Sequence, residues 1–529
     1  MKNWLNEAVV YEIYPQSFYD SNGDGIGDLR GILEKLDYIQ SVGFTAIWLN
    51  PINSSSFRDA GYDVTDFYTV DPRYGTNGDY KALCDAAHSR GMKVIFDLVA
   101  GHTSIDHPWF RESGKVAHNS YSNRYIWTVS TFDEGPGIGG LGERDAKCIE
   151  NFFWSQPALN YGYAHPDPEK PWELPVNHPD CVAMKEELKN IIRFWMELGT
   201  DAFRVDMAAS LIKGDTDGSY TDAFWHEIRA FMEAWDPDCL LIAEWGKPCE
   251  AIRAGFHLDF LLHSGPCAYT SLFRHEEGRN TTKLHIGHSY FHKDGKGDIR
   301  TFLDRYLYDL AQIEEAGDIG LITGNHDMQR LAYGRTPEEV KCALVFLFTM
   351  KGVPFVYYGD EIGMDYIPGL PSKEGGYIRT GSRTPMQWNG NKNHGFSQSD
   401  TPYLPTDSRK TAPTVAKQEA DPDSVLNFVR ALAQLHKTCP ALWADGRLEI
   451  LRTGYPSVFT REQRGEKLLV AINPSGQRRS CQMPEIGGVL LSQNAEAAGG
   501  LLTMEGISFL IAETPGEQDR KPPNNTDIQ

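Results

Sequence analysis

The sequence predicts an α/β protein whose core is an eight-stranded parallel barrel, and three observations lead to that prediction. Short apolar runs, rich in β-branched and aromatic residues, alternate with amphipathic helical stretches over most of the 529 residues. Eight apolar runs occur in order, which is the number that a (β/α)8 TIM barrel requires. Carboxylates, imidazoles and a guanidinium stand at the carboxyl ends of several runs, where barrels of this kind carry their functional groups.

Each predicted strand is a short apolar run, and a helical pattern follows it. The last helix shows the pattern well, because Val425, Phe428 and Leu432 lie on one side of a 3.6-residue period. The predicted strands are 9–14, 45–50, 93–98, 202–206, 240–244, 258–262, 320–326 and 354–359. The predicted helices lie near 32–39, 80–90, 182–198, 224–235, 249–255, 298–315, 337–350 and 425–435.

Two regions interrupt the alternation of strands and helices. After the third strand, about eighty residues dense in Gly, Pro, Asn and Trp precede the next helix, and a connection of this length is usually functional. We therefore expect an inserted subdomain at 105–175, which divides the barrel into 1–104 and 176–440. Short strands separated by turns predict an antiparallel β-domain at 441–515, and the polar tail 516–529 is predicted to be disordered.

Composition and charge limit the possible partners and the compartment. A formal net charge of −21 argues against nucleic acids and anionic membranes, which both need a basic surface. No apolar run approaches the length of a membrane helix, and the N-terminal segment lacks the pattern of a signal peptide. The nine cysteines are dispersed without a CxxC pair, which fits free thiols. We therefore expect a cytoplasmic protein, either a monomer or a small homo-oligomer, with no nucleic-acid or membrane partner.

Ionisable side chains follow four of the predicted strands. One such residue alone is more often a helix cap or a solvated charge, but the ends of barrel strands meet at one mouth. Asp206 and Glu244 follow adjacent strands, which permits the roughly 5–5.5 Å carboxyl separation of a retaining glycosidase. Spacing of the HxH or HxxxH type, which would favour a metal site, is absent around the two histidines. The residues at the strand ends are Asp97, His102, Arg204, Asp206, Glu244, His326 and Asp327.

Several segments resemble the α-amylase superfamily, glycoside hydrolase family 13, and within it the α-glucosidase and oligo-1,6-glucosidase branch. "GTDAFRVD", "IAEW" and "GNHD" are similar to the segments that carry the three catalytic carboxylates of the family. "YDSNGDGIGDLRGI", "DAGYDVTDFYTVDPRYGT", "YYGDEIGM" and "RTPMQW" are similar to segments of the glucosidase branch. The likeness runs from about Val9 to the predicted β-domain, and together these motifs are very specific.

The resemblance implies a role for each carboxylate. Asp206 attacks the anomeric carbon and forms a β-glycosyl ester, and Glu244 acts first as the acid and then as the base. Glu244 is therefore expected to be protonated at rest, while Asp206 is ionised. Arg204 stands two positions before Asp206 on a strand, so that both side chains share a face and the guanidinium favours the anion. Asp327 binds the 2- and 3-hydroxyls of the distorted sugar.

The resemblance also implies how the pocket holds one glucose unit. Tyr62 stacks on this sugar, and Asp59, aided by Arg383, accepts hydrogen bonds from its distal hydroxyls. His102 and His326 donate hydrogen bonds to sugar hydroxyls in the same subsite. A pocket closed by a carboxylate leaves no room for a further sugar, so we expect exo-acting cleavage from the non-reducing end.

The stretch "DSNGDGIGDLRG" begins like an EF-hand calcium loop, with oxygen-bearing side chains at alternate positions. The twelfth position, where an EF-hand has Glu, is Gly31. By resemblance, the stretch is the loop that follows strand one in the glucosidase branch and holds one structural Ca²⁺. An ordinary turn rich in Asp and Asn is the alternative. The implied ligands are Asp20, Asn22, Asp24, the carbonyl of Ile26, and Asp28.

The sequence departs from the family pattern near the acceptor side of the pocket. Gly101 replaces an Asn that binds a second calcium in α-amylases, so we expect that second site to be missing. Ala158 replaces a usual carboxylate, and the stretch 161–179 is longer than in common oligo-1,6-glucosidases. Met207, beside the implied nucleophile, replaces a usual Val or Ala. The linkage preference of the branch therefore cannot be transferred to this chain.

The resemblance implies a retaining exo-acting α-glucosidase that releases glucose from short α-gluco-oligosaccharides, with no organic cofactor. A transglycosylating relative, such as a sucrose isomerase, a trehalose synthase or a glucosyltransferase, would form the same Asp206 ester. A non-catalytic barrel, like the heavy-chain subunits of amino-acid transporters, is the third hypothesis. Those subunits carry a membrane helix and lack the full set of carboxylates, whereas this chain has the set and no such helix.

Overall fold

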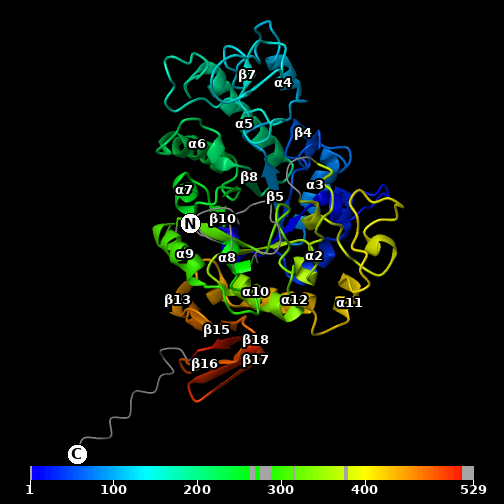
Figure 1. Ribbon diagram of the computed structural model, residues 1–529, viewed down its shortest axis with the longest axis vertical. Helices are drawn as coiled ribbons and strands as arrows, with labels where there is room; N and C mark the ends of the chain where they lie inside the picture. Colours follow the sequence, from blue (N-terminus) through cyan, green and yellow to red (C-terminus); the bar gives the residue numbers. More distant parts are fainter. Residues whose placement is uncertain (1–2, 262–268, 274–287, 314–315, 375–378, 515–529) are drawn as a thin grey trace, which may run out of the picture.

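Eight parallel strands close into a barrel in the order β1-β2-β5-β8-β9-β10-β11-β12, and β12 returns to β1 (Figure 1). The computed structural model describes residues 3–261, 269–273, 288–313, 316–374 and 379–514. The predicted (β/α)8 barrel is confirmed, and each predicted strand coincides with one barrel strand. The end of the predicted strand 258–262 reaches residue 262, which lies outside the described residues. The barrel strands are β1 Val10–Ile13, β2 Ala46–Leu49, β5 Lys93–Leu98, β8 Ala202–Val205, β9 Leu240–Ala243, β10 Leu258–Phe260, β11 Asp318–Ile322 and β12 Val353–Tyr357.

The barrel strands are buried on both faces, because side chains fill the interior and helices cover the outside. Every residue of β1, β2, β8 and β9 is buried, which explains why these strands appear in the sequence as continuous apolar runs. The register is regular, with Val10 opposite Ala46 on one side and Phe355 on the other. The carboxyl ends of all eight strands therefore open on the same mouth.

Most of the helices alternate with the strands, and their ends carry local signals. Thr76 and Asp79 form a capping box at the start of α3, and Thr336 and Glu339 form another at α10. The helices around the barrel are α1 Leu29–Glu34, α2 Leu36–Val42, α3 Asn77–His88, α5 Pro179–Glu197, α6 Ser219–Trp235, α7 Pro248–Arg253, α8 Thr270–Phe273, α9 Arg300–Ile313, α10 Pro337–Thr349, α11 Val415–Glu419 and α12 Val425–Thr438. The 3-10 helices are η1 Trp4–Glu7, η2 Pro15–Ser17, η3 Ala208–Ser210, η4 Asp360–Ile362, η5 Thr380–Ser382, η6 Lys392–Gly395 and η7 Pro440–Leu442.

The long connection between β5 and α5 lies at one end of the molecule in Figure 1. It contains α4 (Pro108–Ser113) and a two-stranded sheet of β6 (Ile138–Gly139) and β7 (Lys147–Cys148). A backbone bridge between His102 and Ala158 ties this segment to the mouth of the barrel. A second small sheet pairs β3 (Asn53–Ser55) with β4 (Val64–Val70), between β2 and α3.

An antiparallel sheet lies at the opposite end of the molecule, which confirms the predicted C-terminal β-domain (Figure 1). Its order is β13-β14-β15-β18-β16, and β17 also pairs with β18. The residue limits predicted for the two added regions stay predictions, and the tail 516–529 lies outside the described residues. Within the described part of the chain, none of the helices has the length and apolar character that crossing a bilayer requires. The strands are β13 Arg447–Arg452, β14 Ser457–Gln463, β15 Glu466–Asn473, β16 Arg479–Gln482, β17 Val489–Ala498 and β18 Leu501–Glu513.

Candidate active site

Arg204, on β8, lies at the centre of a cluster of carboxylates at the mouth of the barrel. Its Nη1 atom is 2.8 Å from Asp97 Oδ1 and 3.1 Å from Asp206 Oδ1, and its Nη2 atom is 2.9 Å from Glu244 Oε1. Although burial opposes the charged form, the Asp97 and Glu244 carboxylates raise the pKa of Arg204 well above its usual value. The guanidinium therefore stays charged, and it lies beside Asp206, where the spacing along β8 predicts it.

Asp206 and Glu244 are hydrogen-bonded to each other. Burial, followed by the charge of Glu244, raises the pKa of Asp206 well above its usual value, so the pair retains a proton. The predicted resting state places this proton on Glu244, and that placement stays a prediction. Glu244 also accepts hydrogen bonds from Arg204 Nη2 at 2.9 Å and from the Met207 N–H at 2.9 Å, which hold its carboxyl beside Asp206.

Asp97 lies behind this pair at the end of β5 and does not reach the surface. Its Oδ2 atom accepts hydrogen bonds from Trp48 Nε1 at 3.1 Å and from the Tyr62 hydroxyl at 3.0 Å. Burial raises the pKa of Asp97 to about 6. The hydrogen bond from the Tyr62 hydroxyl to Asp97 fixes the Tyr62 ring. This ring lies nearly parallel to the His326 ring, with 5.2 Å between the two ring centroids. Tyr62 is thus held at the same mouth as the carboxylates, as the sequence predicts.

Asp327 lies across the mouth between two arginines. Arg379 Nη1 and Arg383 Nη2 lie 2.7 and 2.9 Å from Asp327 Oδ1. Although burial opposes ionisation, the charges of Arg379 and Arg383 hold the pKa of Asp327 well below its usual range. Its side chain is 38% exposed, more than those of Asp206 and Glu244 at 9% and 21%. Asp327 is therefore an ionised acceptor open to a ligand.

Asp59 shares the Arg379 guanidinium with Asp327 and is buried. It forms an ion pair with Arg379 Nη2, and its Oδ2 atom accepts a hydrogen bond from Gln156 Nε2 at 2.8 Å. Arg379 therefore joins Asp59 to Asp327, whereas the resemblance assigns the help for Asp59 to Arg383. Arg379 and Gln156 were not predicted from the sequence. Arg379 stands four positions before Arg383 in an irregular segment, so neither periodicity nor strand spacing could identify it.

The two predicted histidines are both buried at the mouth, and the protein already engages them. The Nε2 atom of His102 lies 2.9 Å from the Tyr62 carbonyl oxygen, and its Nδ1 atom lies 3.2 Å from Asn151 Nδ2. His326 Nδ1 contacts Glu12 Oε1 at 3.0 Å, while its Nε2 atom faces Asp327. Burial lowers the pKa of His102 to about 4 and that of His326 to about 3, so both rings are neutral at neutral pH. Donation from either ring to a sugar stays a prediction.

Gly101, one of the departures from the family pattern, lies against the inserted segment. A Cβ atom at Gly101 would lie 2.8 Å from Asn151 Nδ2, so a larger residue would displace Asn151 from His102. The half-buried Lys213 ammonium donates to Asn151 Oδ1 at 2.9 Å and to the Ser210 carbonyl at 2.7 Å. A protein-borne positive charge therefore lies at this junction of the barrel and the inserted segment.

The loop with the predicted calcium ligands lies between β1 and α1 and folds as successive turns closed by side-chain oxygens. Asp20 Oδ1 accepts hydrogen bonds from the Asn22 and Gly23 N–H groups at 3.1 and 2.7 Å. Asn22 Oδ1 accepts from the Asp24 N–H at 2.9 Å, and Asp24 Oδ1 accepts from the Ile26 N–H at 2.8 Å. The alternation seen in the sequence thus corresponds to one turn after another.

Asp28 completes the loop and caps α1 through a hydrogen bond from the Gly31 N–H at 2.7 Å. A set of oxygen atoms fits the ligand preference of Ca²⁺, and the carboxylate oxygens keep lone pairs beyond these bonds. In the residues that the structure describes, no group of three or more acidic, histidine or cysteine side chains is arranged to hold a metal ion. The predicted calcium site therefore stays a prediction.

Fold and site together define a barrel enzyme that acts on glycosidic bonds, since paired carboxylates meet at the carboxyl ends of its strands. The catalytic-domain model of the α-amylase family matches residues 12–445 of the chain. The chain belongs to the α-amylase family, and the resemblance predicted from its sequence is confirmed.

Relatives with different activities match the chain over most of its length. It is 32% identical to the oligo-1,6-glucosidase of Heyndrickxia coagulans over an alignment of 578 positions, which covers 94% of this chain and 97% of that protein. It is 31% identical to the trehalose synthase of Thermus thermophilus over 525 residues, which cover 91% of this chain and 51% of that protein.

Two solved structures share the fold over 97% of this chain and 100% of theirs. The α-glucosyl transfer enzyme XgtA superposes with a TM-score of 0.80 and 26% identity. The trehalulose synthase of Pseudomonas mesoacidophila MX-45 also superposes with a TM-score of 0.80, at 24% identity, and this second likeness concerns the fold alone.

Proposed function

We propose that this protein is a retaining, exo-acting α-glucosidase that releases glucose from the non-reducing end of short α-gluco-oligosaccharides. The observation that carries the proposal is the direct contact between Asp206 and Glu244 on one guanidinium. An inverting pair stands roughly 6.5–9.5 Å apart, because a water molecule must fit between one carboxylate and the sugar. A hydrogen-bonded pair leaves no such space, and this supports a covalent glucosyl intermediate on Asp206.

The first step begins when the glycosidic oxygen reaches Glu244 and breaks the hydrogen bond between the two carboxyls. The shared proton passes to Glu244 and leaves Asp206 as an anion, which Arg204 stabilises at 3.1 Å. Asp206 then attacks the anomeric carbon as the bond to the leaving oxygen breaks, and Glu244 gives its proton to that oxygen. The products are a β-glucosyl ester and the shortened oligosaccharide.

The second step reverses the roles of the same atoms. Glu244, now an anion, removes a proton from water while the water oxygen attacks the anomeric carbon and the ester to Asp206 breaks. Glucose leaves with the α configuration, and the proton is again shared by the two carboxyls. Asp327, held ionised by Arg379 and Arg383, accepts hydrogen bonds from the 2- and 3-hydroxyls as the ring flattens.

The buried Asp59–Arg379 pair supports cleavage at the end of a chain rather than within it. This pair and the Gln156 amide present charged and polar atoms at the closed side of the pocket. A free 4-hydroxyl would hydrogen-bond to them, whereas a further sugar would bury them without partners, which is costly. The site therefore takes one glucose unit.

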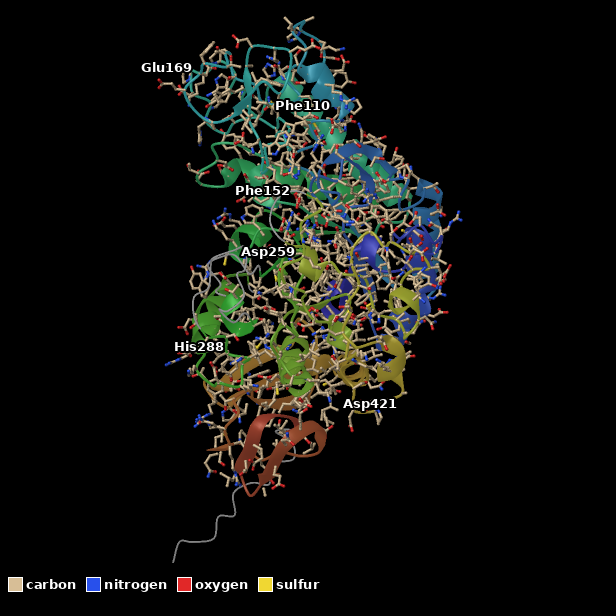
Figure 2. All side chains as sticks on the ribbon, turned by 45° about the vertical axis from the view of Figure 1, so that its right-hand side comes forward. Phe110, Phe152, Glu169, Asp259, His288 and Asp421 are labelled. Atoms are coloured by element: carbon tan, nitrogen blue, oxygen red, sulfur yellow. The ribbon has the colours of Figure 1, made fainter. Side chains whose placement is uncertain are left out.

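Transfer of the glucosyl group to a second sugar is the alternative function, and one observation favours it. Phe152 and Trp154 are 44% and 56% exposed, on the inserted segment between Asn151 and Gln156, which both reach the pocket (Figure 2 labels Phe152). Exposed aromatic faces beside the site offer stacking surfaces for an acceptor sugar. A bound sugar would then compete with water for the ester.

Incubation with maltose and, separately, with sucrose distinguishes the two functions. Hydrolysis predicts glucose as the first product from maltose. The amount of glucose should rise linearly with time at both low and high maltose concentration. Transfer predicts trehalose, isomaltose or longer oligosaccharides from maltose, or an isomer of sucrose from sucrose, in amounts that rise with substrate concentration. A product mixture dominated by such transfer products would overturn the hydrolase proposal while leaving the Asp206 ester in place.

We further propose that the loop 20–28 binds one structural Ca²⁺ through Asp20, Asn22, Asp24, Asp28 and the Ile26 carbonyl. The oxygen-only donor set supports the proposal. The loop leads into α1 and would stabilise the start of the barrel without taking part in the chemistry. A cytoplasmic location is also proposed, because none of the described cysteines forms a disulfide.

A further inference from the structure

Asp259 is a fully buried carboxyl on β10 that the proposed reaction does not use. Its Oδ1 atom accepts hydrogen bonds from the Trp245 N–H at 3.0 Å and the Gly246 N–H at 3.2 Å. Its Oδ2 atom accepts from the Lys247 N–H at 2.8 Å. Three consecutive backbone donors thus converge on one carboxyl, and they belong to the three residues that directly follow Glu244. Figure 2 labels Asp259 in the barrel, below the inserted segment that carries Phe152.

The backbone of Glu244 is held on its other side by β8 and by η3, which follows β8 in the chain. The Glu244 N–H donates to the Val205 carbonyl at 3.0 Å, and the Glu244 carbonyl accepts from the Ala208 N–H at 3.2 Å. The chain then turns sharply at Gly246, whose φ of +73° is a conformation that only glycine adopts readily. The turn would have unpaired N–H groups, one of them on the buried Gly246, if Asp259 did not accept from them. Glu244 therefore stands between two anchors, one on each neighbouring strand.

A carboxyl suits this position better than an amide of the same size, because both of its oxygens can accept hydrogen bonds. Converging N–H groups form a small concavity that attracts an anion, and each carboxyl oxygen offers two lone pairs. Burial raises the pKa of Asp259 to about 8, while the hydrogen bonds from Gly246, Trp245 and Lys247 lower it. An amide of the same shape would place an N–H against one of these donors.

We propose that Asp259 is a positioning residue for Glu244, which holds the acid at the distance from the glycosidic oxygen that proton transfer requires. The inference rests on the proposed role of Glu244 as the acid. Proton donation needs heavy atoms within roughly 2.6–3.2 Å, so a small displacement of the turn removes most of its benefit. Asp206 is carried by β8 and keeps its own support from Arg204, so nucleophilic attack is preserved.

The test separates acid catalysis from nucleophilic attack by means of the leaving group. In Asp259→Asn, kcat/KM is measured for maltose and for aryl α-glucosides whose phenols span a range of pKa. Maltose needs a proton on its leaving oxygen, and we expect a loss of roughly ten- to hundredfold. An acidic phenol leaves without a proton, and we expect less than about a threefold loss. The plot of log kcat/KM against leaving-group pKa should therefore become steeper than in the wild type.

Two further variants keep the proposal falsifiable. Gly246→Ala strains the same turn without touching Asp259, and it should steepen the same plot if Asp259→Asn fails to fold. Glu361→Gln is the matched control: Glu361 is a fully buried carboxyl after β12 that accepts from the Tyr11 and Tyr38 hydroxyls at 2.7 and 2.9 Å. The Glu361→Gln variant should be less stable than the wild type, but the slope of log kcat/KM against leaving-group pKa should be unchanged.

The outcomes also distinguish a failure of the inference about Asp259 from a failure of the proposed function. An equal loss on all leaving groups in Asp259→Asn and Gly246→Ala would mean that Asp259 only stabilises the fold, which overturns the inference. Glu244→Gln provides the reference for a missing acid, and its slope should be the steepest of the series. If Glu244→Gln has the wild-type slope, the acid has been misassigned and the proposed function fails, whatever Asp259 does.

Discussion

Asp59 and Arg379 form a buried ion pair, although 320 positions separate them in the chain. The same guanidinium contacts Asp327 through its other terminal nitrogen, so the two carboxylates share one cation. A ligand that disturbs one carboxylate therefore affects the other. In the proposed function, Arg379 connects the carboxylate that would set exo specificity to the carboxylate that would stabilise the distorted ring.

Replacing Asp59 tests the closed pocket. Asp59→Ala removes the acceptor for the distal hydroxyl and leaves Arg379 with one carboxylate, so kcat/KM on maltotetraose should fall by roughly a hundredfold or more. In the wild-type protein, maltotetraose should give glucose and maltotriose first, as product analysis at early times would reveal. Early maltose, or ready cleavage of a substrate blocked at its non-reducing end, would instead indicate an open cleft.

Asp206→Asn should abolish turnover and leave the fold intact. The amide has the shape of the carboxyl but cannot form the glucosyl ester, so the loss should correspond to roughly 5 kcal/mol or more in the barrier. Steady-state rates on maltose and the thermal melting curve measure the two effects separately. A variant that keeps a tenth of the wild-type activity would contradict the assignment of the nucleophile.

Glu244→Gln should lose activity on maltose and regain it on activated aryl glucosides when azide is added. The variant still forms the ester on Asp206, and azide needs no base to attack it. The product should be α-glucosyl azide, since two displacements retain configuration. Its configuration can be determined by proton NMR, and β-glucosyl azide would show that the roles of Asp206 and Glu244 are exchanged.

The burial of His436 predicts that the protein loses stability at acid pH. Its ring is buried, neither ring nitrogen has a hydrogen-bond partner among the described residues, and burial lowers its pKa to about 3. Between pH 6.5 and 3 the unfolded chain therefore binds a proton that the folded chain does not, and stability is lost as pH falls. Relative to wild type, His436→Leu should gain roughly 1.4 kcal/mol per pH unit across this window.

Urea unfolding of both proteins at a series of pH values measures this difference. Above pH 6.5 the difference in unfolding free energy should become constant, because both states of the wild type are then neutral at this ring. If the difference in unfolding free energy between His436→Leu and wild type does not change with pH, the folded chain binds a proton at this ring as readily as the unfolded chain. That result would contradict the prediction.

Calcium should stabilise the protein without serving the chemistry. A chelator should lower the Tm, since an ion that binds only the folded state stabilises it by mass action. Activity well below the Tm should persist. Asp24→Ala should match the chelated protein and no longer respond to the chelator. An unchanged Tm on chelation and on addition of Ca²⁺ would show that the loop is an ordinary series of turns.

The order of strands and helices was determined by the sequence alone. Buried parallel strands must be apolar on both faces and surface helices on one face. Both patterns can therefore be recognised from short stretches of the sequence. The positions of Asp97, Asp206 and Glu244 followed, because all parallel strands of a closed barrel end at the same mouth. The Arg204 contact with Asp206 was also local, two positions apart on one strand.

Only the tertiary structure decided how the irregular segments meet. Arg379 and Gln156 lie in stretches without periodicity, so nothing in the sequence placed them on Asp59. The same holds for Asp259, whose three donors come from the turn after the neighbouring strand. The raised pKa of Asp206 also emerged only there, because a pKa depends on every charge and donor around a group, and those come together only when the chain folds.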